Sequence, residues 1–374
     1  MKAIGIILAG GNNNRMKELT AKRAVPALPV AGSFRSIDFA LSSMSNSHIQ
    51  TVAVLTQYNA RSLNEHLSSS KWWNFGRKQG GLFLFTPTVT ADNSDWYRGT
   101  ADAMYQNIDF LKRRHEPYVI ISSGDCVYKL DFNRVLDFHI EKKSDITVVC
   151  KDMMYNDDVS RFGVVRMDDE SRITEFDEKP IEALSNTIST GIYVIRRRQL
   201  IELLEAAAEE NRFDFVNDIL VRYKNVKKIY GYKINSYWNN IADIDAYFKT
   251  SMDFLRPDVR SYFFREEPTI CSKVDDLPPA KFNPGSDISN SLVSSGCIIN
   301  GSVEDSVLFK QVFVGKNTTV KNCVILNDVY IGDNVHLENC IVESRGTINP
   351  NTCYCGEDGV CLLYTSPSPR DVEE

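Results

Sequence analysis

The sequence has no long apolar run and no excess of basic charge. None of its apolar segments approaches the roughly 20 residues that a helix needs to cross a bilayer. Its 43 basic residues are outnumbered by 49 acidic ones, which gives a net charge of −6. A protein that binds nucleic acid or a membrane surface would present a basic face, so we expect neither partner. The chain opens with a strand-like segment and no signal peptide, and we therefore expect a cytoplasmic protein.

The sequence also lacks an obvious zinc motif. Its five histidines form no set, and its nine cysteines are scattered and odd in number. Cys353 and Cys355 flank a single residue, which is too close for a usual zinc pair, and no histidine or cysteine lies at a metal-ligand spacing from them. We expect free thiols in a reducing compartment.

Strand-like and helix-like segments alternate over residues 1–250. This alternation predicts a mostly parallel sheet with helices on both faces, which binds ligands where its strands end. The turns at Gly10 and Gly11 and at Gly124 and Asp125 follow such strands. The predicted strands are 4–8, 51–56, 118–122 and 145–150, and the predicted helices are 61–66, 101–114 and 132–142.

A different period governs the C-terminal part. Prolines punctuate residues 256–287, which predicts a linker. Beyond them aliphatic residues recur every six positions, with one shortened coil, at Leu308, Val314, Val320, Leu326, Ile331 and Leu337. Hexads of this kind are typical of a left-handed parallel β-helix; the alternative is an ordinary antiparallel sheet. We predict domains at 1–255 and 288–360, and a disordered or extraneous tail at 361–374.

The N-terminal glycine turn, LAGGNNNRM, has the chemistry to bind phosphate. Backbone N–H groups of Gly10 and Gly11 can approach phosphate oxygens without obstruction, and Arg15, Lys22 and Arg23 add positive charge. The spacing matches neither a dinucleotide fingerprint nor a P-loop, and a solvated basic turn is the alternative.

Other candidate residues lie at the ends of predicted elements. Asp125 is suited either to hold Mg²⁺ or to cap a helix. Thr100, after Gly99, opens a helix where a sugar or base could bind. Glu178 and Lys179 precede a proline; Lys179 could bind a sugar phosphate and Glu178 the sugar hydroxyls.

Together these segments resemble the glucose-1-phosphate adenylyltransferase family over about residues 1–345. The resemblance rests on LAGG, RAVPALPVAGSFRSIDFALS, TQYNARSLNEHL, WYRGTADAMYQN, SGDCVYKLDF, FGVV and FDEKP. It implies an α/β, Rossmann-like nucleotidyltransferase domain followed by the β-helix, acting on ATP and glucose 1-phosphate to make ADP-glucose for glycogen or starch. It also implies Mg²⁺ and a homo- or hetero-tetramer assembled partly through the β-helix.

The resemblance assigns roles to individual residues. It implies a metal ligand at Asp125, a catalytic arginine at Arg15 and an effector contact at Lys22. It implies nucleotide binding at Leu8, Ala9, Gly10, Gly11, Gln57, Gly99 and Thr100. It implies glucose 1-phosphate binding at Tyr97, Gly163, Glu178, Lys179 and Ser189.

Three positions depart from the family pattern. Where active members read GGRGTRL, KRAKPA and W-R-D-V-G, this chain has Asn12, Val25 and Asn240. Two cations that would face the triphosphate and one metal carboxylate are therefore missing. Each such electrostatic group is typically worth about 10²–10³ in rate. We expect a regulatory subunit with little activity, resembling the D-type subunit that pairs with an active C-type subunit. The alternatives are a fully active adenylyltransferase, an enzyme for another sugar or base, and a scaffold.

Overall fold

The computed structural model describes residues 2–11, 14–76, 80–88, 96–154, 158–356 and 359–364. It divides into two compact units. The first comprises Met1–Gly11 and Phe39–Trp238, and the second comprises Asn12–Asp38 and Asn239–Glu374. Helix α1 (Ser36–Asn46) belongs partly to each. Within the described part of the chain, no helix has the length and apolar character needed to span a bilayer.

The first unit is built on a nine-stranded sheet whose centre is parallel, as the sequence predicts. Strand β1 runs parallel to both its neighbours, β4 and β6, and β5 extends the parallel part beyond β4. On the other side β11 is antiparallel to β6, and the β9–β10 hairpin is antiparallel too. The strands are β1 (Ala3–Leu8), β4 (Thr51–Leu55), β5 (Gly81–Phe85), β6 (Tyr118–Ser123), β8 (Ile146–Asp152), β9 (Gly163–Met167), β10 (Ile173–Glu178), β11 (Thr187–Arg196) and β12 (Ile229–Lys233).

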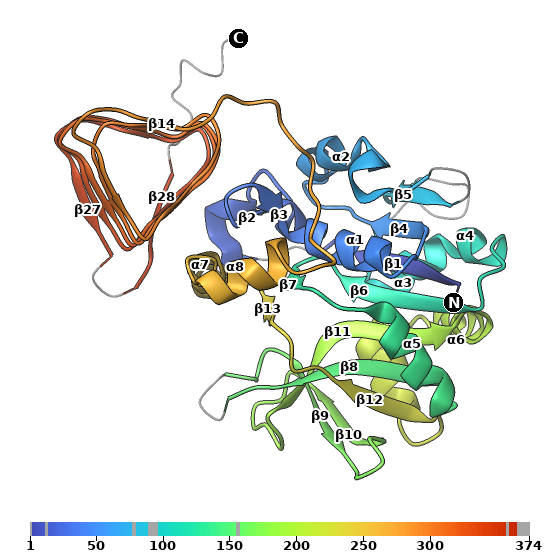
Figure 1. Cartoon of the computed structure of the whole chain (residues 1–374). Coiled ribbons are helices and arrows are strands. Elements are labelled where there is room, and N and C mark those ends of the chain that lie inside the picture. The colour runs from blue at the N-terminus through green and yellow to red at the C-terminus, as the bar shows by residue number, and fades with distance from the viewer. Residues whose placement is uncertain are drawn as a thin grey trace. The chain divides into compact units, whose positions relative to one another are not determined.

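Helices pack on both faces of this sheet (Figure 1). Helix α5 contacts β8, β11 and β12, while α6 contacts β6 and β11 from the opposite face. The helices are α2 (Arg61–Leu67), α3 (Thr100–Gln106), α4 (Ile108–Lys112), α5 (Phe132–Glu141) and α6 (Arg197–Glu209), with short turns η3 (Ser70–Trp73) and η4 (Val216–Val221) and strand β7 (Cys126–Tyr128).

The single helix expected over 101–114 is wrong, because the chain breaks it at Asn107. That residue has φ −110° and ψ 22°, outside the helical region. Its amide Nδ2 donates to the Ala103 carbonyl at 2.9 Å and to the Tyr97 hydroxyl at 3.0 Å. A side chain that competes for backbone acceptors in this way favours a helix end.

The second unit combines the segment after the glycine turn with two helices. The elements are η1 (Asn14–Thr20), η2 (Val25–Ala27), β2 (Pro29–Val30), β3 (Phe34–Arg35), α7 (Ile244–Asp253) and α8 (Pro257–Phe264), together with β13 (Trp238–Asn240), whose first residue belongs to the first unit. The Tyr247 hydroxyl of α7 donates to the Pro29 carbonyl at 2.7 Å, and Phe34 stacks on Phe264 of α8 at 4.5 Å. Helix α8 lies at the start of residues 256–287, so the first part of this segment is a packed helix and not the expected linker.

The C-terminal strands form three parallel five-stranded sheets, the arrangement of a left-handed hexapeptide β-helix, and Figure 1 shows its triangular outline. The first sheet holds β14 (Lys281–Phe282), β17 (Ile298–Ile299), β20 (Phe313–Val314), β23 (Tyr330–Ile331) and β26 (Thr347–Ile348). The second holds β15 (Asp287–Ser289), β18 (Ser302–Glu304), β21 (Thr319–Lys321), β24 (His336–Glu338) and β27 (Cys353–Cys355). The third holds β16 (Leu292–Val293), β19 (Val307–Leu308), β22 (Val324–Ile325), β25 (Cys340–Val342) and β28 (Cys361–Leu363).

The predicted hexad residues form the interior of this β-helix. All six aliphatic residues named above are fully buried. The corners use asparagines with positive φ, which stack from coil to coil: Asn317 donates to Asn334 at 3.3 Å, and Asn334 donates to Asn351 at 3.0 Å, each 17 residues further on. Asparagine tolerates the left-handed conformation better than other non-glycine residues.

The β-helix is longer than the sequence predicts at both ends. Its first strand starts at Lys281, inside the expected linker. At the other end Cys361 pairs with Cys340, so the tail prediction is wrong for residues 361–363. Residues 365–374 of the expected tail lie outside the described residues.

Candidate functional site

The glycine turn and Asp125 leave the sheet at the same edge. The Ala9 N–H donates to the Leu55 carbonyl at 2.8 Å, and the Gly124 N–H donates to the Leu8 carbonyl at 3.0 Å. These bonds extend the parallel pairing of β1 with β4 and β6 by one residue. Ligands of open parallel sheets bind beyond such strand ends.

The two glycines differ in their surroundings. A Cβ on Gly10 would lie 3.4 Å from Cγ of Gln57, whereas a Cβ on Gly11 would have no neighbour within 4 Å. The space at Gly11 allows a ligand to approach the backbone closely. The next residue of the turn, Asn12, lies outside the described residues.

Asp125 is held as a half-buried carboxylate between β6 and β7. Its Oδ1 accepts from the Ser123 hydroxyl and from the Cys126 thiol, the latter at 3.4 Å. The alternative role as a helix cap is wrong, because Asp131 caps the next helix, α5, by accepting from the Asn133 N–H at 3.0 Å. The Ser123 hydroxyl and the Cys126 thiol therefore fix the orientation of the Asp125 carboxylate at the edge of the sheet.

Gln57 fixes the backbone of the segment that leads into α3. Its Oε1 accepts from the Tyr97 N–H at 3.0 Å, and its Nε2 lies 3.4 Å from the Tyr97 carbonyl. Beside this pair, the rings of Tyr58 and Trp96 stack at 5.4 Å and are both exposed. The amide of Gln57 thus orients the chain, and the two exposed rings form a flat aromatic surface next to it.

The start of α3 is anchored on the segment 213–215. A Cβ on Gly99 would lie 2.3 Å from the Phe213 carbonyl oxygen, so only glycine fits there. The same carbonyl accepts from the Ala101 N–H at 2.8 Å. The Thr100 hydroxyl accepts from the Phe215 N–H at 2.9 Å. Gly99 and Thr100 are therefore needed for this packing, in addition to any ligand contact.

Gly163, Glu178 and Lys179 meet at one end of the β9–β10 hairpin. Glu178 pairs in register with Gly163, where a Cβ would lie 2.9 Å from the Glu178 carboxylate. Lys179 has φ +51°, and its Nζ lies 3.3 Å from Glu178 Oε1. The lysine is 63% exposed and the glutamate 18%, so the ammonium group faces solvent while the carboxylate is sheltered. Burial raises the pKa of Glu178, and Lys179 partly offsets this effect.

Three more polar groups surround Glu178. The Ser189 hydroxyl donates to the Tyr193 hydroxyl at 3.3 Å, where the pairing of β11 with β8 is interrupted by a bulge. Burial raises the pKa of Tyr193, and the nearby carboxylates of Glu178 and Asp214 raise it further. The Ser189 and Tyr193 hydroxyls and the carboxylates of Glu178 and Asp214 therefore lie near one another. Tyr97 is buried and bonded to Asn107, which puts it on the α3 side of the site.

No sequence pattern indicates Asp214 and Tyr193, which lie near Glu178. Asp214 follows a long helix by a few residues and has no motif around it; its position near Glu178 depends on the fold returning the chain to α3. Tyr193 has the pattern of an ordinary strand residue, and its hydrogen bond with Ser189 spans a bulge in the pairing of β11 with β8.

The remaining predicted residues belong to the second unit. Arg15 in η1 and Lys22 are exposed, whereas Val25 is 5% exposed and packs into η2. The Asn240 side-chain oxygen accepts from the Ala242 N–H at 3.0 Å. Val25 contributes an apolar contact where a lysine would place charge, and the Asn240 amide forms a local turn.

The comparisons with known proteins agree with this architecture. Residues 4–256 match the nucleotidyl transferase family model, and residues 278–360 match the model of the GlmU-like C-terminal hexapeptide domain. The fold and the sheet-edge site therefore define a nucleotidyltransferase carrying a hexapeptide β-helix.

Its relatives define the family further. The chain is 38% identical to a glucose-1-phosphate adenylyltransferase of Clostridium novyi over 320 residues, which are 85% of this chain and 84% of the relative. It is 36% identical to the Bacillus subtilis protein of that name over 322 residues, or 85% and 84%. It is 39% identical to the Pseudothermotoga lettingae protein over 322 residues, or 85% and 76%. The chain belongs to the glucose-1-phosphate adenylyltransferase family, which confirms the resemblance inferred from its motifs.

Proposed function

We propose that this chain is a regulatory subunit of glucose-1-phosphate adenylyltransferase in glycogen synthesis, with little activity alone. The assembled enzyme would convert ATP and glucose 1-phosphate to ADP-glucose and pyrophosphate. The observation that carries the proposal is the contrast between the two halves of the site. The sugar-phosphate half keeps its charged residues, whereas positions expected to face the triphosphate and the metal carry apolar or amide side chains.

The sugar-phosphate half supports binding. Lys179 offers a solvent-facing ammonium group to a phosphate, and the sheltered Glu178 carboxylate can accept hydrogen bonds from sugar hydroxyls. Ser189, Tyr193 and Asp214 add further polar groups beside Glu178. Tyr97, held by Gln57 and Asn107, would complete the wall on the α3 side.

The residues of the nucleotide half are the reason to expect slow turnover. Leu8, Ala9, Gly10 and Gly11 keep the turn that would receive the nucleotide. Arg15 remains as a cation, but Val25 is buried and uncharged. Nucleotidyl transfer depends on positioning and on neutralising phosphate charge, so missing cations lower the rate more than the affinity for sugar phosphate.

The residues fit Mg²⁺ only in part. Asp125 supplies one carboxylate, fixed at Oδ1 by Ser123 and Cys126. At Asn240, the position that the family resemblance gives to a second metal carboxylate, the side chain carries no charge and its oxygen already accepts from the Ala242 N–H. When bound, Mg²⁺ would neutralise the phosphates of ATP beside Asp125. The protein groups then have to orient the phosphates with one negative ligand fewer.

Association with a catalytic subunit, or with further copies of this chain, would use an exposed surface of the β-helix. Ile298, Phe313 and Tyr330 lie in one register column on three successive strands. Ile298 and Tyr330 are exposed, and the rings of Phe313 and Tyr330 stack at 4.9 Å. An exposed apolar column of this kind favours subunit contact. A regulatory effect would require tighter binding to the working conformation of the partner than to its resting one.

The test is ADP-glucose synthesis by three preparations: the chain alone, the chain mixed with an active family member, and the variant Asn12→Arg/Val25→Lys/Asn240→Asp. We expect the lone chain to be nearly silent, the mixture to exceed the partner alone, and the triple variant to gain at least about 100-fold. Activity of the lone chain equal to that of an ordinary family member would instead establish the alternative, a fully active adenylyltransferase.

A further inference from the structure

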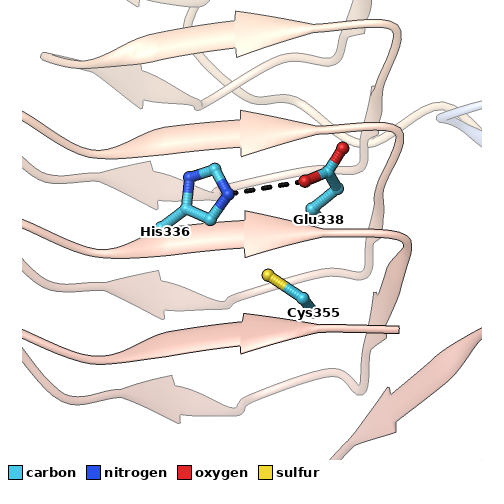
Figure 2. A group of neighbouring side chains, drawn as sticks. All are labelled: His336, Glu338 and Cys355. Atoms are coloured by element: carbon cyan, nitrogen blue, oxygen red, sulfur yellow. Dashed lines mark ion pairs between the residues drawn. The ribbon is translucent and has the colours of Figure 1, made fainter. Parts of the chain in front are cut away.

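Four side chains with metal-binding chemistry lie together on the outside of the β-helix. His336 and Glu338 are in β24, and Cys353 and Cys355 are in β27, the next strand of the same sheet. The register places His336 opposite Cys353 and Glu338 opposite Cys355. Leu337, between the first two, is fully buried, so its neighbours project outward. Figure 2 shows His336, Glu338 and Cys355 on this outer face.

The ligand atoms are already close to one another. His336 Nε2 lies 3.6 Å from Glu338 Oε2, and the Sγ atoms of Cys353 and Cys355 are 3.8 Å apart. Ligand atoms of His336, Glu338 and Cys355 all lie within 4.8 Å of one another. Zinc–ligand distances near 2.0–2.3 Å in a tetrahedron separate neighbouring ligand atoms by roughly 3.5 Å. Small side-chain rotations would therefore bring these three groups around one ion, and Cys353, whose Sγ lies 3.8 Å from that of Cys355, can supply the fourth ligand.

We propose that His336, Glu338, Cys353 and Cys355 form a zinc site that links the last two strands of this sheet. Thiolate and imidazole ligands select Zn²⁺ over Mg²⁺, which prefers oxygen ligands. On binding, both thiols and any imidazolium release their protons to solvent, and four metal–ligand bonds form without a change in oxidation state. The site lies outside the nucleotidyltransferase fold and does not depend on the function proposed above.

The β-helix explains how separated residues make such a site. Cys353 and Cys355 are too close in sequence to form a usual zinc motif by themselves, and no histidine or cysteine lies at a metal-ligand spacing from them in the sequence. The partners lie one coil earlier, because a coil of 17 residues brings β24 beside β27. A metal bound there would join two coils near the open end of the β-helix, where fewer neighbours stabilise the strands.

The experiment uses the full chain, stripped of metal with a chelator and kept reduced with a phosphine. Zn²⁺ binding is measured by competition with a chromogenic chelator, and Co²⁺ is added separately as a spectroscopic probe. We expect one Zn²⁺ per chain that excess Mg²⁺ does not displace. We also expect thiolate-to-cobalt charge transfer and tetrahedral ligand-field bands, and a rise of a few degrees in the melting temperature with Zn²⁺.

Matched variants separate this site from nonspecific binding. Cys353→Ser/Cys355→Ser and His336→Gln should each weaken Zn²⁺ binding by at least about 100-fold and abolish the thermal shift. Cys271→Ser makes the same chemical change at an exposed cysteine outside the β-helix and should have no effect. All substitutions lie on exposed or half-exposed positions, and circular dichroism confirms folding. Zn²⁺ binding that survives the double substitution, or its absence in the reduced full chain, would overturn the proposal.

Discussion

Arg23 and Glu343, 320 residues apart in sequence, form an ion pair within the second unit. Their side chains are only 17% and 15% exposed. The same Glu343 oxygen accepts from the Ser344 N–H at 2.6 Å. Burial raises the pKa of Glu343, and Arg23 partly offsets this effect. The pair thus fixes the segment after the glycine turn onto the third sheet of the β-helix.

We expect Glu343→Gln to lower the free energy of unfolding by about 1–3 kcal/mol, because it leaves the Arg23 guanidinium sheltered and without its counter-charge. Urea unfolding followed by tryptophan fluorescence and circular dichroism measures the loss. The double variant Arg23→Met/Glu343→Met removes both charges and should recover part of the stability.

A surface pair provides the control for this prediction. Lys321 and Glu304 lie 3.9 Å apart with side chains 45% and 48% exposed. Exposed pairs contribute little, so Glu304→Gln should change stability by less than about 0.5 kcal/mol. Equal effects of the two Glu→Gln substitutions would show that the Arg23–Glu343 pair has no special role.

A second prediction concerns Gly99. An alanine there would place its Cβ 2.3 Å from a backbone carbonyl oxygen, which cannot rotate away. We expect Gly99→Ala to reduce stability by about 1–3 kcal/mol and to weaken glucose 1-phosphate binding, because α3 and residues 213–215 must separate. Isothermal titration and urea midpoints measure the two effects. Gly11→Ala, where a Cβ has open space, is the matched control for stability and should be neutral.

The fold was predictable where local pattern and tertiary packing agree. The apolar runs ending at Leu8 and Ser122 and the hexads from Leu308 to Leu337 predicted the parallel sheet and the β-helix correctly, because each pattern has one way to bury its apolar residues. The helix break at Asn107 and the strand that starts at Cys361 were not predictable in this way. A helix break made by one side-chain amide and a last coil longer than its predecessors leave no periodic signal.

The candidate site was predictable only at the strand ends. Gly10, Gly11 and Asp125 follow strands and could be placed at one edge of the sheet from topology alone. The group around Glu178 depends on how Asp214 returns to the N-terminus of α3 and on the bulge after Ser189, and neither feature has a sequence pattern.

The pH dependence of stability offers a third prediction, through His139. Its side chain is fully buried, with Nδ1 2.9 Å from the Thr147 hydroxyl and its ring edge-on to Tyr118. Burial lowers the pKa of His139 from 6.5 to about 4; Arg196 lowers it further and Asp145 raises it. Between pH 6.5 and about 4, the imidazole of His139 is therefore protonated in the unfolded state but neutral in the folded state.

A lowered pKa of a base gives stability that is fully present above pH 6.5 and is lost as the pH falls toward 4. The contribution of His139 to that loss is at most about 3 kcal/mol. We expect His139→Gln to flatten the decline in urea midpoint between these two pH values, whatever its effect at neutral pH. His115→Gln, at an exposed histidine, should leave the slope unchanged. A slope identical to that of the unmodified chain in both variants would contradict the prediction.

The last prediction concerns Glu178 and Lys179, which carry the sugar-phosphate half of the site. Lys179→Met removes the solvent-facing cation and should weaken glucose 1-phosphate binding by about 10–100-fold, as expected for charge-assisted hydrogen bonds. Glu178→Gln should weaken it by a similar factor.

The same carboxylate predicts a pH dependence of binding. Because burial raises the pKa of Glu178, its carboxylate becomes protonated at a higher pH than usual. The affinity of the unmodified chain for glucose 1-phosphate should therefore begin to fall at that higher pH as the solution is acidified. Titration calorimetry across pH measures both effects. Glu170→Gln, in an exposed turn of the same hairpin, is the control. Unchanged glucose 1-phosphate affinity in both site variants would remove the main support for sugar-phosphate binding by this chain.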